Sequence, residues 1–141
     1  MSSSNNAIDR PRFTETDDLA IKNLTKTATP DIPYIQIKHQ VLGLDYFLSL
    51  VFIGDKRARY LNRTYRQQNY TPSILSFPLS DSEGEMFIDL CRSKKKAEKQ
   101  DSDLDRYTAF LFIHGLLHLK GLQHGSTMER REQELWQEFG W

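Results

Sequence analysis

Two patterns of apolar and polar residues recur along this chain, and each predicts one kind of element. Short runs rich in β-branched and aromatic residues, bounded by polar or proline-containing segments, are typical of β-strands. Four segments have this character, at 19–26, 46–54, 73–79 and 85–90. The densest is "YFLSLVFIG" at 46–54, and it is the clearest strand in the sequence.

Most of the other segments have patterns that indicate helices. We expect helices at 34–43, 55–68, 93–100, about 102–120 and 128–139. Ser102 with Asp105, and Ser126 with Glu129, resemble capping boxes before the last two helices. Nine of the thirteen residues at 107–119 are apolar and point in every direction around the helix axis, which indicates a buried central helix. Because strands come first and helices last, we expect an α+β domain whose helices pack on a small mixed β-sheet.

Composition and charge narrow the class of protein. A length of 141 residues fits one domain, which we place at 18–141 after a polar tail, 1–17, that we expect to be disordered. The 19 acidic and 19 basic residues cancel, so net charge indicates no partner. Cys91 is the only cysteine, which excludes an internal disulfide and fits a reducing cytoplasm. No apolar run reaches the ~18 residues of a membrane span, and the start lacks the apolar core of a secretory signal.

Three histidines lie in one of the most apolar stretches of the chain, "HGLLHLKGLQH" at 114–124. His114 and His118 are four residues apart, so a helix projects them from one face, about 40° apart. Gly121 permits a reversal of the chain through positive φ, which would return His124 to the same point. Three imidazoles suit a catalytic zinc ion, because they leave its fourth position open to water. Hydrogen-bonded core histidines are the alternative, but each unsatisfied buried imidazole would cost about 1–3 kcal/mol.

The spacing H-x-x-x-H-x-x-G-x-x-H is also that of the metzincin proteases. In those enzymes a glutamate follows the first histidine and acts as the general base. Gly115 stands at that position here, and glycine cannot accept a proton. The spacing therefore favours a metal site but disfavours a peptidase. His39 is distant in sequence from the other histidines, and we expect it to be an ordinary structural histidine.

A second candidate site is a row of basic residues on the helix at 55–68, formed by Lys56, Arg59, Arg63 and Arg66. Their spacing of three, four and three places them within about 80° of one another around the helix. The opposite face would pack on the sheet through Ala58, Leu61 and Tyr65. A row of arginines suits a phosphate backbone, because each guanidinium can donate two hydrogen bonds to one phosphate. A solvated helix face is the alternative, and it is what we expect for the lysine run at 94–96.

The chain resembles the YbeY family of bacterial endoribonucleases, which mature ribosomal RNA. The resemblance covers nearly everything from about residue 19 onward and is carried by "LNRTYR" at 61–66, "SILSFP" at 73–78, "GEMFI" at 84–88 and "HGLLHLKGLQHGSTME" at 114–129. It implies a zincin-like α+β fold, one zinc ion per chain bound by His114, His118 and His124, and cleavage of single-stranded RNA. It also implies a role in 3′-end maturation of small-subunit rRNA and in ribosome quality control, with the ribosomal small subunit as a partner. Arg66 matches the arginine that the family holds near its metal.

Two positions depart from the family's pattern. Ser73 stands where the family usually has the aspartate of P-T-D-V-L-S-F, and Gln123 stands where it usually has an aspartate before the third histidine. Both changes remove a carboxylate near the expected site, but neither residue is one of the three ligands. The changes therefore bear on the surroundings of the metal and on the catalytic rate rather than on metal binding itself.

Together these features predict a metal-dependent endoribonuclease in which zinc activates water or polarises the scissile phosphate. Arg66 would stabilise charge on the phosphoryl oxygens, and Lys56, Arg59 and Arg63 would bind the RNA backbone. No residue of the histidine motif is an obvious general base. Two alternatives stay open: another zinc-dependent hydrolase, such as a metzincin-like peptidase, or a non-catalytic ribosome-associated module whose metal only holds the fold together.

Overall fold

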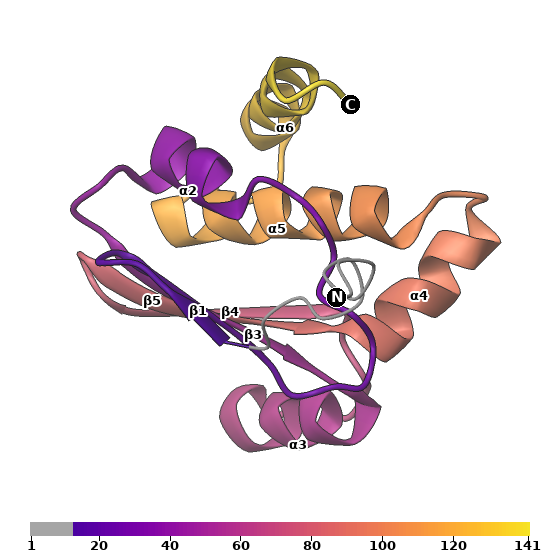
Figure 1. The fold of residues 1–141 in the computed structure, drawn as a ribbon. Helices are drawn as coiled ribbons and strands as arrows, with labels where there is room; N and C mark the ends of the chain where they lie inside the picture. The colour runs from indigo at the N-terminus through magenta and orange to yellow at the C-terminus, as the bar shows by residue number, and fades with distance from the viewer. Residues whose placement is uncertain (1–12) are drawn as a thin grey trace, which may run out of the picture.

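The computed structural model describes residues 13–141, and in this part of the chain helices cover both faces of one β-sheet (Figure 1). The strands are β1 (Phe13–Glu15), β2 (Leu19–Asn23), β3 (Phe47–Ile53), β4 (Ile74–Ser80) and β5 (Glu83–Asp89). The helices are α2 (Tyr34–Leu42), α3 (Asp55–Arg66), α4 (Leu90–Lys99), α5 (Leu104–Lys120) and α6 (Ser126–Glu138). The predicted α+β architecture is confirmed.

The sheet is mixed, and its strands follow the order β1-β2-β3-β5-β4. The three inner strands β2, β3 and β5 run parallel, whereas the edge strands β1 and β4 are antiparallel to their neighbours. Parallel neighbours need a crossover connection, which α2 supplies between β2 and β3 and which α3 with β4 supplies between β3 and β5. The two crossover helices lie on opposite faces of the sheet (Figure 1).

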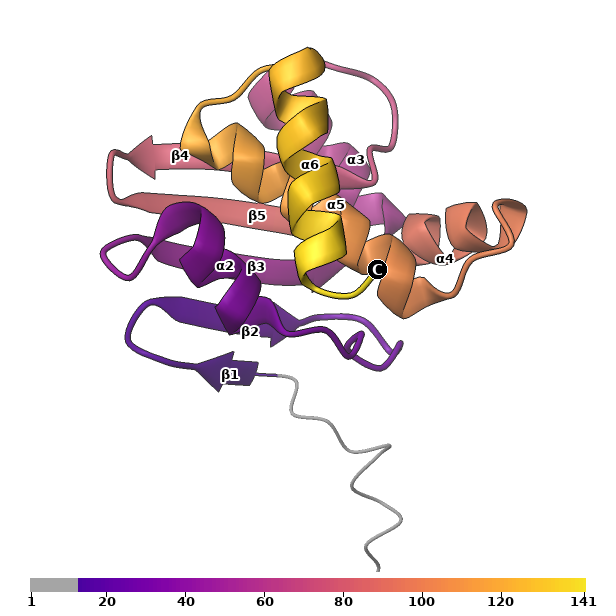
Figure 2. The same cartoon turned by 90° about the horizontal axis from the view of Figure 1, so that it is seen from above.

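The main core lies between the sheet and α5. Alternate residues of a strand point to the same face, and those of β3 and β5 that point toward α5 are fully buried: Leu48, Leu50, Phe52, Met86 and Ile88. Helix α5 buries nine of its residues, in agreement with its apolar sequence. Helix α2 packs beside α5, and α6 crosses over it (Figure 2). None of the helices within residues 13–141 is both long and apolar enough to span a bilayer.

The helix ends confirm one prediction and correct two. Gly121 ends α5 with φ 106°, and its N–H donates to the carbonyl of His118, as a glycine cap requires. Asp103 rather than Ser102 caps the start of α5, and its carboxylate accepts from the Arg106 backbone N–H at 2.7 Å. A carboxylate is a stronger acceptor than a hydroxyl, which explains this preference. The second predicted box is also wrong, because Ser126 is already helical and makes no capping hydrogen bond.

The N-terminal tail was predicted to be disordered over 1–17. Residues 1–12 lie outside the described residues, but Phe13–Glu15 form strand β1 and pair antiparallel with β2, with Thr14 opposite Ile21. The prediction is therefore wrong for these three residues. Their side chains are exposed, so backbone hydrogen bonds to β2 hold the strand, and such bonds leave no mark in the hydrophobic pattern.

Candidate metal centre

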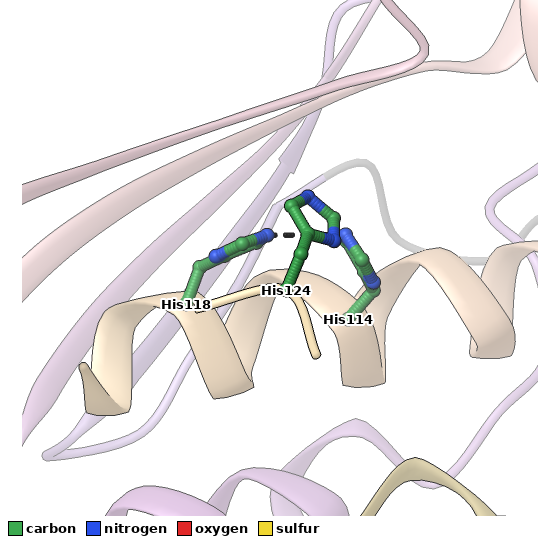
Figure 3. Close-up of side chains that lie close together, drawn as sticks. All are labelled: His114, His118 and His124. Carbon is green, nitrogen blue, oxygen red and sulfur yellow. Dashed lines mark hydrogen bonds between the residues drawn. The ribbon is translucent and has the colours of Figure 1, made fainter. Parts of the chain in front are cut away.

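The structure brings the three predicted histidines to one point (Figure 3). His114 and His118 project from the same face of α5, and His124 returns to them from the turn that follows Gly121. One ring nitrogen from each histidine lies within 4.8 Å of the others. The ring centroids are 4.6 to 5.1 Å apart. This is the convergence that a bound metal ion requires.

The hydrogen bonds of the two helical histidines orient their rings. Nδ1 of His114 lies 2.6 Å from the Glu132 carboxylate, and Nδ1 of His118 lies 3.2 Å from the Leu122 carbonyl oxygen. Both partners accept, so each Nδ1 carries the proton and each Nε2 keeps its lone pair. The two Nε2 atoms are 3.1 Å apart, which is close to the ~3.3 Å expected between two ligands of a tetrahedral zinc ion at ~2.0–2.1 Å. The triad therefore fits a zinc ion.

Burial and the neighbouring imidazoles act in the same direction on the pKa of His118. Burial lowers the pKa of His118, and the neighbouring His114 and His124 lower it further. A lowered pKa favours the neutral imidazole, which is the form that binds a metal. His114 and His118 are partly buried, whereas His124 is exposed. The site is thus open to solvent on the side of His124, which suits a ligand position accessible to water or substrate.

Glu132 is the residue that sequence reasoning missed. It lies on α6, its side chain is 17% exposed, and its carboxylate binds the imidazole of His114. Histidine ligands of metals usually donate their second ring N–H to such an acceptor. That rule predicts that a carboxylate is present but not which one, because α6 alone carries four glutamates: Glu129, Glu132, Glu134 and Glu138.

Gly115, at the position of the metzincin general base, faces the sheet rather than the triad. A Cβ atom there would lie 2.7 Å from Ile74 Cδ1 and 2.7 Å from Met86 Cε. The glycine thus lets α5 pack closely on β4 and β5. A glutamate at this position would point into the core, so the position itself, and not only its residue, is unsuited to a protease base.

The basic row on α3 lies on the face of the sheet opposite α5 (Figure 1). Its members Lys56, Arg59, Arg63 and Arg66 are all exposed. Three of them line a surface hollow of about 420 Å³, namely Lys56, Arg59 and Arg63. Arg59 Nε donates to Thr71 Oγ1 at 3.1 Å, and within the described residues the side chains of the other three form no ion pair or hydrogen bond. The structure therefore forms the predicted row but places it across the sheet from α5, the helix that carries His114 and His118.

The buried face of α3 differs in part from the prediction. Ala58 is buried and Leu61 is partly buried, but Tyr65 is 64% exposed, and its ring forms a T-shaped pair with that of Phe77 on β4. Asn62 is the fully buried residue on this face, and its Nδ2 donates to the Tyr70 carbonyl oxygen at 3.1 Å. That bond ties the loop after α3 back to the helix, and so helps to position Arg66 at the helix end.

Within residues 13–141, the side chains of Ser73 and Gln123 form no hydrogen bond to the triad. The carbonyl oxygen of Ser73 accepts from the Asp89 N–H at 2.9 Å, and Gln123 is exposed. Neither residue is hydrogen-bonded to one of the three histidines. His39 lies apart from the triad, with Nε2 2.6 Å from the carboxylate of Asp18.

Comparison with known proteins identifies relatives of this chain. The family model described as Endoribonuclease YbeY matches residues 12–140. A curated protein of that name from Mycoplasma mycoides subsp. mycoides is 36% identical over an alignment of 98 residues, and the match covers 62% of this chain and 60% of the relative. Another, from Mesoplasma florum, is 30% identical over an alignment of 138 residues, and the match covers 87% of this chain and 78% of the relative.

Two further comparisons concern the length of the relatives and the fold of a solved structure. The chain spans only 56% to 62% of the length of three of the curated relatives that it matches, among them the protein from Mycoplasma mycoides. The solution structure of TM1509 from Thermotoga maritima matches with a TM-score of 0.57 and 22% sequence identity, covering 74% of each chain. At that identity the likeness concerns the fold, and it agrees with the α+β architecture seen here.

Proposed function

This chain belongs to the YbeY family, and we propose that it is a metal-dependent endoribonuclease that cleaves single-stranded RNA. The observation that carries the proposal is the histidine triad, whose ring nitrogens meet within 4.8 Å and in which the Nδ1 acceptors of His114 and His118 leave their Nε2 lone pairs for a metal. The relatives that bear the name Endoribonuclease YbeY support the substrate class. The α+β domain, taken as 18–141, would be the catalytic unit.

Zinc is the metal that we propose, with one ion per chain. The three candidate ligands His114, His118 and His124 are all imidazoles, which suit zinc better than the oxygen-preferring magnesium ion. A zinc ion bound there would lower the pKa of a water molecule toward ~7 or polarise the scissile phosphate. Glu132 and the Leu122 carbonyl would hold the rings in place throughout the reaction.

The arginines would supply the positive charge that RNA cleavage needs. Arg66 ends α3 and directly precedes the loop that leads to β4, the strand that packs on α5. We assign to Arg66 the stabilisation of charge on the phosphoryl oxygens, because its guanidinium is exposed and unpaired among the described residues. Lys56, Arg59 and Arg63 would bind more distant phosphates, and their hollow on the other face of the sheet is the surface for this contact.

The cellular role follows the family resemblance. We propose that the protein acts in the cytoplasm, in 3′-end maturation of small-subunit rRNA and in ribosome quality control, and that the ribosomal small subunit is its partner. The single cysteine supports a reducing compartment.

One experiment tests the activity against both alternatives. Zinc-loaded protein is incubated with single-stranded RNA, with the same sequence as a duplex, and with casein, and Arg66→Ala serves as the comparison. We expect cleavage of the single strand alone and a strong loss of rate in Arg66→Ala. Digestion of casein would support the peptidase, and a metal-loaded protein without any hydrolytic activity would support the non-catalytic module.

A further inference from the structure

A groove between α5 and α6 lies next to the contact between Glu132 and His114 of the histidine triad. Its larger part is a hollow of about 710 Å³ whose wall includes Phe110, Glu132 and Trp136. A second hollow of about 250 Å³ shares Phe110 and Trp136 with the first and adds Arg106, so the two form one groove. Glu132 belongs to the wall and also binds His114. The groove and the triad are therefore adjacent parts of one surface.

Phe110 gives this groove an aromatic floor. It is 44% exposed, although most of the apolar residues of α5 around it are buried. One side of its ring stacks on His114, with centroids 6.3 Å apart and an angle of 26° between the planes. Trp136 stands against it edge to face, at 6.2 Å and 87°. A partly exposed ring beside a perpendicular ring offers aromatic surface on which a nucleic-acid base can stack.

Charges around the groove are arranged so that a base rather than a phosphate would enter it. The Arg106 guanidinium lies 4.9 Å from the centroid of the Trp136 ring, and Arg130 lines the larger hollow. Neither arginine forms an ion pair within residues 13–141. Glu129 and Glu132 also line the hollow and would repel a phosphate there, whereas a carboxylate can accept from the amino groups of bases. Phosphates would instead lie toward the two arginines.

We propose that this groove is a nucleobase subsite for single-stranded RNA. A base stacks on Phe110 against Trp136, and the adjoining phosphates are bound by Arg106 and Arg130, which leads the next phosphodiester bond toward the triad. Only an unpaired base can leave its stack to bind in this way, so the subsite would also explain a preference for single strands. The inference rests on the RNA-directed activity proposed above and names the surface that selects the substrate.

Phe110→Leu tests the subsite, because leucine keeps the apolar side chain but has no aromatic face. The affinity of zinc-loaded protein for a short single-stranded RNA is measured by fluorescence anisotropy in the cold, and RNA integrity is checked afterwards. We expect binding about fivefold to a hundredfold weaker, the range for loss of one stacked base. Phe110→Tyr keeps the ring and should bind like the wild type. Phe13→Leu removes another exposed ring, on β1, and is the matched control.

A second arm uses RNA that carries an abasic nucleotide at successive positions. With the wild type, one abasic position should weaken binding as much as Phe110→Leu weakens binding of the normal RNA. Combining the variant with that abasic RNA should weaken binding no more than either change alone. Equal binding of Phe110→Leu and Phe13→Leu, or abasic RNA that binds as tightly as normal RNA at every position, would overturn the subsite even if the enzyme cleaves RNA. Phe110-dependent binding without cleavage would instead retain the subsite and overturn the endoribonuclease activity.

Discussion

The carboxylate of Glu132 lies 2.6 Å from Nδ1 of His114, so the last helix of the chain orients a candidate metal ligand on the central helix. The two residues are 18 positions apart in sequence, and the intervening turn carries the third histidine, His124. The same contact thus holds α6 against α5 beside the site. It also sets the tautomer that leaves Nε2 of His114 free. Its chemical consequence is a more basic and better-placed ligand.

Glu132→Ala is therefore expected to weaken zinc affinity by about tenfold to a hundredfold, because the imidazole of His114 loses its orienting acceptor. Competition with a chelator of known affinity measures this. Glu134→Ala is the matched control, since Glu134 lies on the same helix but pairs with Arg131 at the surface. Equal losses in the two variants would show that the effect comes from α6 as a whole and not from the contact with His114.

His118→Ala should largely abolish zinc binding, whereas His39→Ala should leave about one ion per chain. The first change removes one of three converging imidazoles, and the second removes a histidine that pairs with Asp18 away from the triad. Elemental analysis of protein purified without added metal gives the stoichiometry. Full metal content in a His114→Ala, His118→Ala double variant would rule out the triad as the site.

Gly115→Glu should not create a peptidase and should destabilise the fold by about 3 kcal/mol or more, because the new carboxylate would enter the packed core beside Ile74 and Met86. Gly115→Ala is the companion variant. We expect it to change the free energy of unfolding by no more than about 1 kcal/mol, since the gain in helix propensity offsets crowding of two flexible side-chain ends. Urea denaturation compares the two, and a stable Gly115→Glu protein would contradict this account of the packing.

Asp89→Asn should stabilise the protein increasingly as the pH rises from about 4 to 7. Burial, and then the neighbouring Asp55 carboxyl, raise the pKa of Asp89 to about 7. Between the ordinary value of 3.8 and about 7 the folded state holds a proton that the unfolded state releases, so wild-type stability falls across this window. Asparagine mimics the protonated form and still caps α4, where Asp89 Oδ1 accepts from the Arg92 N–H.

The gain at pH 8 is expected to exceed about 1 kcal/mol. Thermal unfolding of both proteins at several pH values measures the trend. Asp103→Asn, the same substitution at the exposed cap of α5, is the control and should show no comparable rise. A gain that does not depend on pH would refute the role assigned to the buried carboxyl.

Reversing Arg59 and Arg63 to glutamate should weaken RNA binding and flatten its salt dependence. Each contact to a single-stranded phosphate makes the slope of log affinity against log salt steeper by about 0.7. The loss of two contacts should therefore reduce the magnitude of this slope by at least about 1.4. Lys94→Glu with Lys96→Glu makes the same change in charge on α4, where a solvated face is expected. Parallel effects of the two pairs would indicate that only overall charge matters.

Local patterns were sufficient to predict most elements and the three candidate ligands of the site. The period of the α-helix places His114 beside His118 whatever surrounds them, and a glycine after the last turn reverses the chain at Gly121. The strands at β3, β4 and β5 were predicted for the same reason, because alternation and β-branched content act within a few residues. Strand β1 was missed since its exposed residues bury nothing.

What the sequence by itself determined is therefore which residues share a helix face or a strand face. Only the tertiary structure decided that Glu132 rather than another glutamate of α6 meets His114, that Gly115 faces the sheet, and that α3 lies on the side of the sheet away from α5. Each of these depends on how distant elements pack. Such packing is set by the sum of many weak contacts across the core, which no spacing along the chain encodes.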